Sequence, residues 1–219
     1  MKNARLKVKG ILLDLDGTIV DSREAYSEAM KIALEKMGQK ATDNKKVTEI
    51  PKRLEQGLPI DDVINGANVK EFLAFYLKAY YEATTTKAKP MPCIKETLEK
   101  LSRKAKLAVV TMRHVPKSKV VEELDRFGLA EYISNVVTAL DTRYPKPSPE
   151  ALMKCSNQMG LETYECAIVG DSIVDVRAGK AAGAKTVAVL SGIFTRRELE
   201  TEKPDLILEN VKKLPCFVE

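Results

Sequence analysis

Histidine, tryptophan and cysteine are scarce in this sequence of 219 residues: it has one histidine, no tryptophan and four cysteines. The cysteines lie far apart and form no C-x-x-C pair, at positions Cys93, Cys155, Cys166 and Cys216. With His114 as the single histidine, the chain offers no set of His and Cys ligands for a zinc ion. We therefore expect reduced, buried thiols in place of a zinc site.

Long hydrophobic runs and blocks of one charge are also missing. No segment reaches the roughly eighteen uninterrupted apolar residues of a membrane span, and the start of the chain lacks a long apolar signal region. Thirty-six basic and thirty-one acidic side chains give a net charge of +5, and the lysines are scattered along the chain. We expect a cytoplasmic protein with no nucleic-acid or membrane partner. Nothing in the sequence indicates an oligomeric state.

What the sequence does contain is a series of short apolar runs. They read as buried strands over Val8–Leu15, Leu107–Thr111, Cys166–Gly170 and Thr186–Leu190. Helical stretches separate them, and the connections are too long for hairpins. This alternation predicts an α/β fold with a Rossmann-like parallel sheet and helices on both of its faces.

The carboxyl ends of these strands carry the polar residues. Asp14 and Asp16 end the first run, Thr111 ends the second, and Asp171 follows the third. Because ligands of open parallel sheets bind beyond the carboxyl ends of the strands, we expect these four side chains to meet there.

Between the first two strands lies a long stretch with helical periodicity. One helix is predicted to begin at Asp21 or Ser22 and to stop at Gly38, and another to cover Val69–Tyr81, with Thr84–Pro92 as the return linker. We predict a core domain of residues 1–16 and 93–219 and a small all-helical cap domain of residues 17–92. The aromatic stripe of Phe72, Tyr76 and Tyr80 is interpreted as packing.

The carboxylates indicate a metal. Asp14 and Asp16 project toward one opening, and Gly17 lets the chain turn away from it. Asp171 and Asp175 add two more acids, and carboxylates gathered in this way repel one another unless a cation lies among them. Oxygen ligands without histidine or thiolate favour a hard ion such as Mg²⁺.

Two further side chains could receive a phosphate. A carboxylate nucleophile that attacks a phosphate dianion needs its charge neutralised, and Lys146, held in a proline-rich segment, is the obvious second cation. Thr111 can donate its hydroxyl to a phosphoryl oxygen.

Taken together, the motifs resemble those of the haloacid dehalogenase superfamily, specifically its phosphatases with a helical cap inserted after the first motif. The resemblance covers nearly the whole chain, in the family's order, with motifs at Asp14–Ser22, Val109–Thr111, Lys146–Glu150 and Val169–Asp175. It implies that Asp14 is the nucleophile and a metal ligand. It also implies that Asp16 is the general acid and then the general base, and that it binds the metal through its backbone carbonyl.

The remaining roles follow from the same resemblance. Thr111 and Lys146 would bind the phosphoryl group, Asp171 would bind the metal, and Asp175 would hold Lys146 or a metal-bound water. Arg53 lies in a segment similar to the substrate-facing loop of the cap in phosphoglycolate phosphatases and sugar phosphomutases.

The motifs indicate the type of reaction more closely than they indicate the substrate. Where many phosphoglycolate phosphatases have Asn after the second motif's Thr, this chain has Met112, followed by Arg113 and His114. We expect Arg113 to add a cation beside the phosphate. The leading expectation is a small phosphorylated metabolite like phosphoglycolate, and the alternative is a sugar-phosphate phosphatase or a phosphomutase like β-phosphoglucomutase. A phospho-acceptor switch would need neither Asp16 nor a cap.

Overall fold

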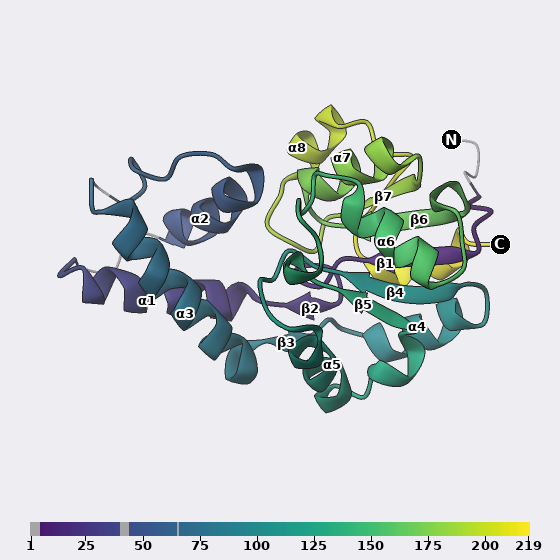
Figure 1. The fold of residues 1–219 in the computed structure, drawn as a ribbon, viewed down its shortest axis with the longest axis horizontal. Coiled ribbons are helices and arrows are strands. Elements are labelled where there is room, and N and C mark those ends of the chain that lie inside the picture. The colour runs from purple at the N-terminus through teal and green to yellow at the C-terminus, as the bar shows by residue number, and fades with distance from the viewer. Residues whose placement is uncertain (1–4, 40–43, 65) are drawn as a thin grey trace. The chain divides into compact units, whose positions relative to one another are not determined.

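The computed structural model describes residues 5–39, 44–64 and 66–219 (Figure 1). Contacts divide the chain into two compact units, one formed by Met1–Val20 with Pro90–Glu219 and the other by Asp21–Lys89. We call them the core unit and the helical unit. That residues 17–92 form a domain of their own stays a prediction.

The core unit is built on a six-stranded sheet whose order is β5-β4-β1-β6-β7-β8. Neighbouring strands run parallel, and Leu13 at the end of β1 pairs with Val109 of β4 on one side and Val169 of β6 on the other. The strands are β1 (Gly10–Leu13), β4 (Lys106–Val110), β5 (Asn135–Val137), β6 (Cys166–Gly170), β7 (Lys185–Val189) and β8 (Leu206–Leu208).

Helices lie on both faces of this sheet, so the predicted α/β fold is confirmed (Figure 1). The α-helices of the core unit are α4 (Ile94–Ser102), α5 (Lys117–Arg126), α6 (Glu150–Gln158), α7 (Ile173–Ala182) and α8 (Arg196–Thr201). Short 3₁₀ turns complete it: η1 (Ala130–Tyr132), η2 (Ala139–Asp141), η3 (Thr163–Glu165) and η4 (Val211–Cys216).

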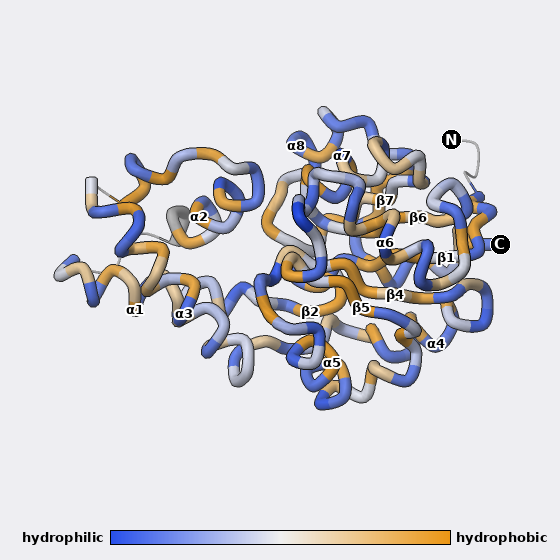
Figure 2. The backbone as a smooth tube through the Cα atoms, in the orientation of Figure 1, coloured by the Kyte–Doolittle hydropathy of each residue, from blue (hydrophilic) through white to orange (hydrophobic). Residues whose placement is uncertain are grey.

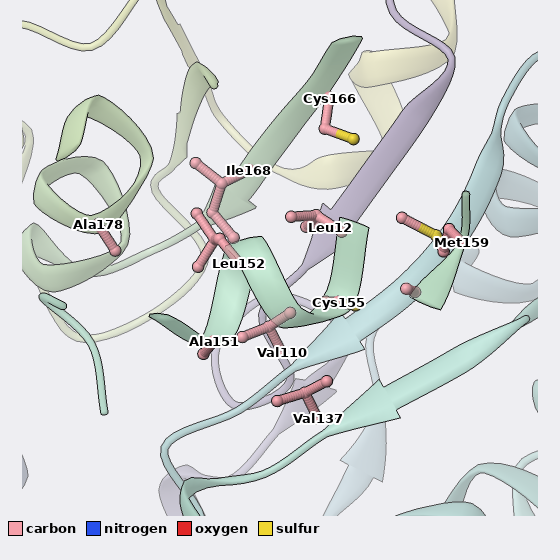
Figure 3. Packing of buried hydrophobic residues seen from close by; sticks show 11 residues of the cluster. Leu12, Val110, Val137, Ala151, Leu152, Cys155, Met159, Cys166, Ile168 and Ala178 are labelled. Atoms are coloured by element: carbon pink, nitrogen blue, oxygen red, sulfur yellow. The ribbon is translucent and has the colours of Figure 1, made fainter. Parts of the chain in front are cut away.

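The strands are hydrophobic because both of their faces are covered (Figure 2). On one face, alternate strand residues such as Leu12, Val110 and Ile168 pack against Leu152 of α6 and Ala178 of α7 (Figure 3). All five side chains are almost wholly buried. This packing fixes the ends of β1, β4 and β6 relative to one another.

The helical unit contains α1 (Arg23–Lys36), α2 (Asn44–Gln56) and α3 (Val69–Lys87). The chain enters and leaves it through β2 (Val20–Asp21) and β3 (Lys89–Pro90), which pair as a two-stranded sheet. Tyr26 of α1 stacks on Tyr80 of α3 with ring centroids 5.2 Å apart, and Phe72 and Tyr76 are buried. The interpretation of the aromatic stripe as packing is confirmed.

The expectation about the return linker is wrong. The return linker does not begin at Thr84, because α3 continues to Lys87. The hydroxyls of Thr84 and Thr85 donate to the carbonyls of Tyr81 and Glu82, so both hydroxyls find acceptors within the helix.

The cysteines also differ from expectation in part. Cys155 and Cys166 are buried, whereas Cys93 and Cys216 are exposed. Cys93 adopts a positive φ of 61° immediately before α4, at a surface turn where its side chain has no core to enter.

Among the described residues, no helix is both long enough and apolar enough to cross a membrane.

Candidate active site

Three parallel strands deliver one polar side chain each to the same edge of the sheet. Asp14 follows β1, Thr111 follows β4 and Asp171 follows β6, each directly after the last strand residue. The amide of Asp14 still donates to the carbonyl of Val169 (2.8 Å), so the ladder continues to this point. Asp14, Thr111 and Asp171 are 7%, 4% and 5% exposed. The sheet therefore brings together three of the four residues that the sequence predicts to meet, and the fourth, Asp16, lies in the turn after β1.

Lys146 joins this edge from the loop before α6. Its ammonium donates to Asp14 Oδ1 (2.6 Å), to Asp175 Oδ1 (2.5 Å) and to the carbonyl of Val110 (3.1 Å). Three acceptors satisfy the three donors of a lysine. Burial alone would lower the pKa of Lys146, but the two carboxylates outweigh it and raise that pKa above its ordinary value. Lys146 is thus a fixed positive charge beside the carboxylate of Asp14.

Asp175 reaches the site from the first turn of α7 and not from a strand end. The amide of Ser172 donates to its second oxygen, Oδ2, at 3.2 Å, within a capping box that starts the helix. One carboxylate therefore both begins α7 and holds Lys146.

Asp14, Asp171 and Asp175 form a buried acidic cluster. Each offers one oxygen, and these atoms lie within 4.8 Å of one another. Burial is the largest cause that raises the pKa of Asp14; Asp175 and Asp16 raise it further, and Lys146 opposes them. A single ammonium does not balance three carboxylates, so the donor set and its charge fit a hard divalent cation.

Glycines make the room for Asp171. A Cβ atom at Gly17 would lie 2.6 Å from the carboxylate of Asp171, and a Cβ atom at Gly192 would lie 1.6 Å from its Oδ2. Gly17 also has a φ of +81°, which a residue with a side chain rarely adopts. The amide of Ile193 donates to Asp171 Oδ2 at 3.2 Å. Two segments distant in the sequence thus fit closely around this one acid.

Asp16 lies in the turn that follows β1, and its carboxylate pairs with Arg113. Arg113 Nε donates to Asp16 Oδ2 at 2.8 Å and Nη2 donates to Oδ1 at 2.6 Å, a bidentate arrangement. Arg113 Nη1 donates to Glu123 Oε2 of α5. The structure therefore shows Arg113 bound to two carboxylates, and its predicted contact with a substrate phosphate stays a prediction.

The other residues of the second motif differ in exposure. The amide of Arg113 donates to the hydroxyl oxygen of Thr111 at 3.1 Å, which fixes the direction of that side chain. Met112 is half-buried and His114 is exposed. Of these residues, Thr111 is the one whose hydroxyl lies buried directly at the end of β4.

Arg53 belongs to the helical unit. It lies in the last turn of α2, where the sequence predicted a loop, and it pairs with Glu49 and Asp62 and donates to the carbonyl of Pro59. Its predicted role in substrate binding stays a prediction.

Glu123 and Gly192 are the residues that sequence reasoning missed. A signal for Glu123 exists: it lies between Val120 and Leu124, on the apolar stripe of an amphipathic helix, where an acid is out of place unless it is paired. Gly192 carries no comparable signal, because its closeness to Asp171 arises only in the folded chain.

Comparison with known proteins agrees with this geometry. The haloacid dehalogenase-like hydrolase family matches residues 11–189. A phosphoglycolate phosphatase of Aquifex aeolicus is 33% identical over 205 residues, which cover 93% of each chain. The pyrophosphatase PpaX of Bacillus velezensis is 28% identical, with 95% of each chain covered.

A solved structure shows the same fold. A haloacid dehalogenase-like hydrolase from Streptococcus pneumoniae superposes with a TM-score of 0.82 at 19% identity, covering 96% of this chain and 98% of that one. At this identity the likeness concerns the fold alone. The match of the family over most of the chain, together with the Aquifex aeolicus relative, shows that the chain belongs to the haloacid dehalogenase-like hydrolase family.

Proposed function

We propose that this protein is a Mg²⁺-dependent phosphatase that hydrolyses a small phosphomonoester through an aspartyl-phosphate on Asp14. The observation that carries the proposal is the position of Asp14, buried at the end of β1 and bound to the ammonium of Lys146 at 2.6 Å. The names of the relatives support it, because phosphoglycolate phosphatases and pyrophosphatases both transfer phosphoryl groups to water.

In the first step a carboxylate oxygen of Asp14 attacks the phosphorus atom. The bond between phosphorus and the ester oxygen breaks, and Asp16 gives its proton to the departing alkoxide. Lys146 and the hydroxyl of Thr111 bind the phosphoryl oxygens, which brings positive charge to a dianion that must approach a carboxylate.

In the second step water releases the phosphate. Asp16, now ionised, accepts a proton from water as the water oxygen attacks phosphorus, and the bond to Asp14 breaks. Inorganic phosphate leaves and Asp16 is protonated again. Asp16 therefore serves as acid and as base in one cycle, with no net gain or loss of protons on the protein.

Asp14 and Asp171 are the side chains that we propose to hold Mg²⁺, together with the backbone carbonyl of Asp16. When bound, the ion supplies positive charge that offsets the acidic cluster and the phosphoryl group. Asp175, which binds Lys146 at 2.5 Å, is proposed to hold that lysine in place.

A phosphoglycolate-like metabolite is the substrate that we propose first, because the Aquifex aeolicus relative carries that name. Arg53 is proposed to contact the part of the substrate that bears no phosphate. The alternative remains a sugar-phosphate phosphatase or phosphomutase. A mutase would return the phosphoryl group to a second hydroxyl of its substrate and would release little phosphate.

The test is phosphate release with Mg²⁺ and with a chelator. The panel contains phosphoglycolate, sugar phosphates, nucleotides, pyrophosphate and an aryl phosphate, and a mock preparation purified in the same way from cells without the protein reports contaminating phosphatases. Mg²⁺-dependent release with one preferred ester supports the proposal and identifies the substrate. No Mg²⁺-dependent release from any compound would overturn it.

A further inference from the structure

Three charged side chains form a chain that leads away from the acidic cluster. Asp16 binds Arg113 through two hydrogen bonds, and Arg113 binds Glu123 of α5 through a third. The side chains of Asp16, Arg113 and Glu123 are 13%, 5% and 7% exposed. Charged groups are rarely buried to this degree unless each has a partner.

The geometry divides the guanidinium between its two carboxylates. Nε and Nη2 form one edge of the planar group and face Asp16, while Nη1 faces Glu123. A planar guanidinium held from two sides cannot rotate about its stem without losing a bond, whereas one held from a single side can swing. Glu123 therefore fixes the plane in which Arg113 meets Asp16.

Asp16 lies in a turn, next to Gly17 with its φ of +81°, and the strand has already ended at Leu13. The bidentate contact with Arg113 restrains the rotamer of Asp16 in this turn. Glu123 lies on the apolar stripe of a helix, at a site where burial raises the pKa of its carboxyl although Arg113 opposes the rise.

We propose that Glu123 is a positioning residue, which acts through Arg113 to hold the side chain of Asp16 in one orientation. Glu123 touches neither substrate nor reacting atoms. The inference rests on the proposed function, in which Asp16 is the general acid and base, and it adds to that function the groups that orient Asp16.

A role in positioning the proton donor predicts a difference in kinetics between alkyl and aryl phosphates. A general acid assists the departure of an alkoxide much more than that of a stabilised aryl oxide, because the alkoxide is the stronger base. The kcat/KM value includes the steps up to expulsion of the alcohol, so it senses this assistance. Misplacing Asp16 therefore lowers kcat/KM for an alkyl phosphate far more than for an aryl phosphate, whereas a general loss of folded protein lowers both alike.

The experiment compares Glu123→Gln with Glu122→Gln, a matched control on the same helix whose carboxylate is exposed and pairs with Lys119. We expect Glu123→Gln to lower kcat/KM for the preferred alkyl phosphate by about 10–100-fold and for an aryl phosphate by less than about threefold, with most of the loss in kcat. Asp16→Asn should show the same split at larger size, and Glu122→Gln should show neither loss. Equal losses for both substrates, or no loss, in folded Glu123→Gln would overturn the proposal.

A second measurement does not depend on turnover. In nitrogen-15 NMR spectra the Nε–H of Arg113, assigned by its loss in Arg113→Lys, should exchange slowly in the wild type and at least about tenfold faster in Glu123→Gln. Unchanged exchange would contradict the positioning role. If the wild type hydrolyses none of the panel but shows this change, the proposed function fails and the positioning contact stands.

Discussion

Lys146 of the core unit and Arg53 of the helical unit each bind two carboxylates, yet the two sites differ in burial. Lys146, Asp14 and Asp175 have side chains 2%, 10% and 2% exposed. Arg53 is 23% exposed, and its partners Glu49 and Asp62 are 43% and 69% exposed. Water solvates and screens the second group, and it hardly reaches the first.

This difference decides what the same kind of pairing can do. In a buried site each charge has been taken out of water, so its partners must remain in place and their electrostatic effect on a bound anion is strong. In an exposed site the pair contributes little to stability, and a competing ligand can displace one partner at small cost. The buried group around Lys146 is therefore suited to stabilising charge during a reaction. The exposed group around Arg53 is suited to giving up one of its carboxylates for a ligand.

The largest effect is expected at the core edge for Asp14→Asn. The substitution keeps the shape of the side chain but removes the nucleophile, so turnover of every substrate should fall at least about a thousandfold. Steady-state phosphate release measures it, with Asp125→Asn, an exposed acid of α5, as the control. Steady hydrolysis by a clean Asp14→Asn protein would remove the covalent mechanism.

Lys146→Met should reduce both activity and stability. Removing the ammonium leaves Asp14 and Asp175 buried without their cation, which should lower the free energy of unfolding at neutral pH by about 3–5 kcal/mol. Urea unfolding measures this change, and the exposed Lys119→Met serves as the control.

The pH dependence of this variant has a definite sign. Burial raises the pKa of Asp14, and loss of the lysine that opposes the rise should raise it further. The folded variant then binds more protons than the unfolded chain, so its stability should recover as the pH falls. A deficit that stays constant or widens on acidification would contradict the account.

The same difference between a buried and an exposed site applies to the thiols of Cys155 and Cys93. Burial raises the pKa of Cys155 to about 12, above its ordinary value of 9.0. In the window between these values the folded protein keeps a proton that the unfolded chain loses, so stability is lost as the pH rises. The stability advantage of the wild type over Cys155→Ala should shrink by about 1–2 kcal/mol between about pH 8 and pH 10.5. Cys93→Ala is the exposed control, and an advantage that does not shrink would refute the prediction.

The smallest effect is expected for Arg53→Gln. Because its ion pairs are open to solvent, the melting temperature should stay close to that of the wild type. If Arg53 binds the substrate, KM should rise by up to about tenfold with kcat nearly unchanged. Calorimetry and steady-state kinetics measure the two, with Lys52→Gln as a neighbouring control. A loss of stability comparable to that of Lys146→Met would contradict the difference drawn between the buried Lys146 group and the exposed Arg53 group.

The parts of the fold that could be predicted are those with strong local signals. The four apolar runs correspond to β1, β4, β6 and β7, each within two residues at either end. Strands β5 and β8 were missed, because three residues are too few to show a period and these strands border the sheet.

The helical unit shows a second limit. Helix α2 was not predicted: it contains Pro51, and few of its positions are apolar. Pro is unfavourable inside a helix, so a local signal argued against the element that tertiary packing forms around the buried Ile50.

The site could be predicted where its residues follow strands or carry a motif. Asp14, Thr111 and Asp171 meet because parallel strands end at one edge. The partners of Arg113 could not be deduced, since its ion pair with Asp16 joins residues 97 apart in the sequence and its ion pair with Glu123 depends on how α5 packs. Asp175 was grouped with the other acids from its motif, and only the structure shows that it starts α7 and binds Lys146 as well.

The most direct test of the central claim is to find the phosphoryl group on the protein. Asp16→Asn with Mg²⁺ and an aryl phosphate should still transfer phosphate to Asp14 but hydrolyse it slowly, because the leaving group needs little protonation whereas water needs a base. Acid quenching, digestion and peptide mass spectrometry should then locate one phosphoryl group on Asp14. A phosphoryl group on another residue, or none while phosphate is released, would contradict the account.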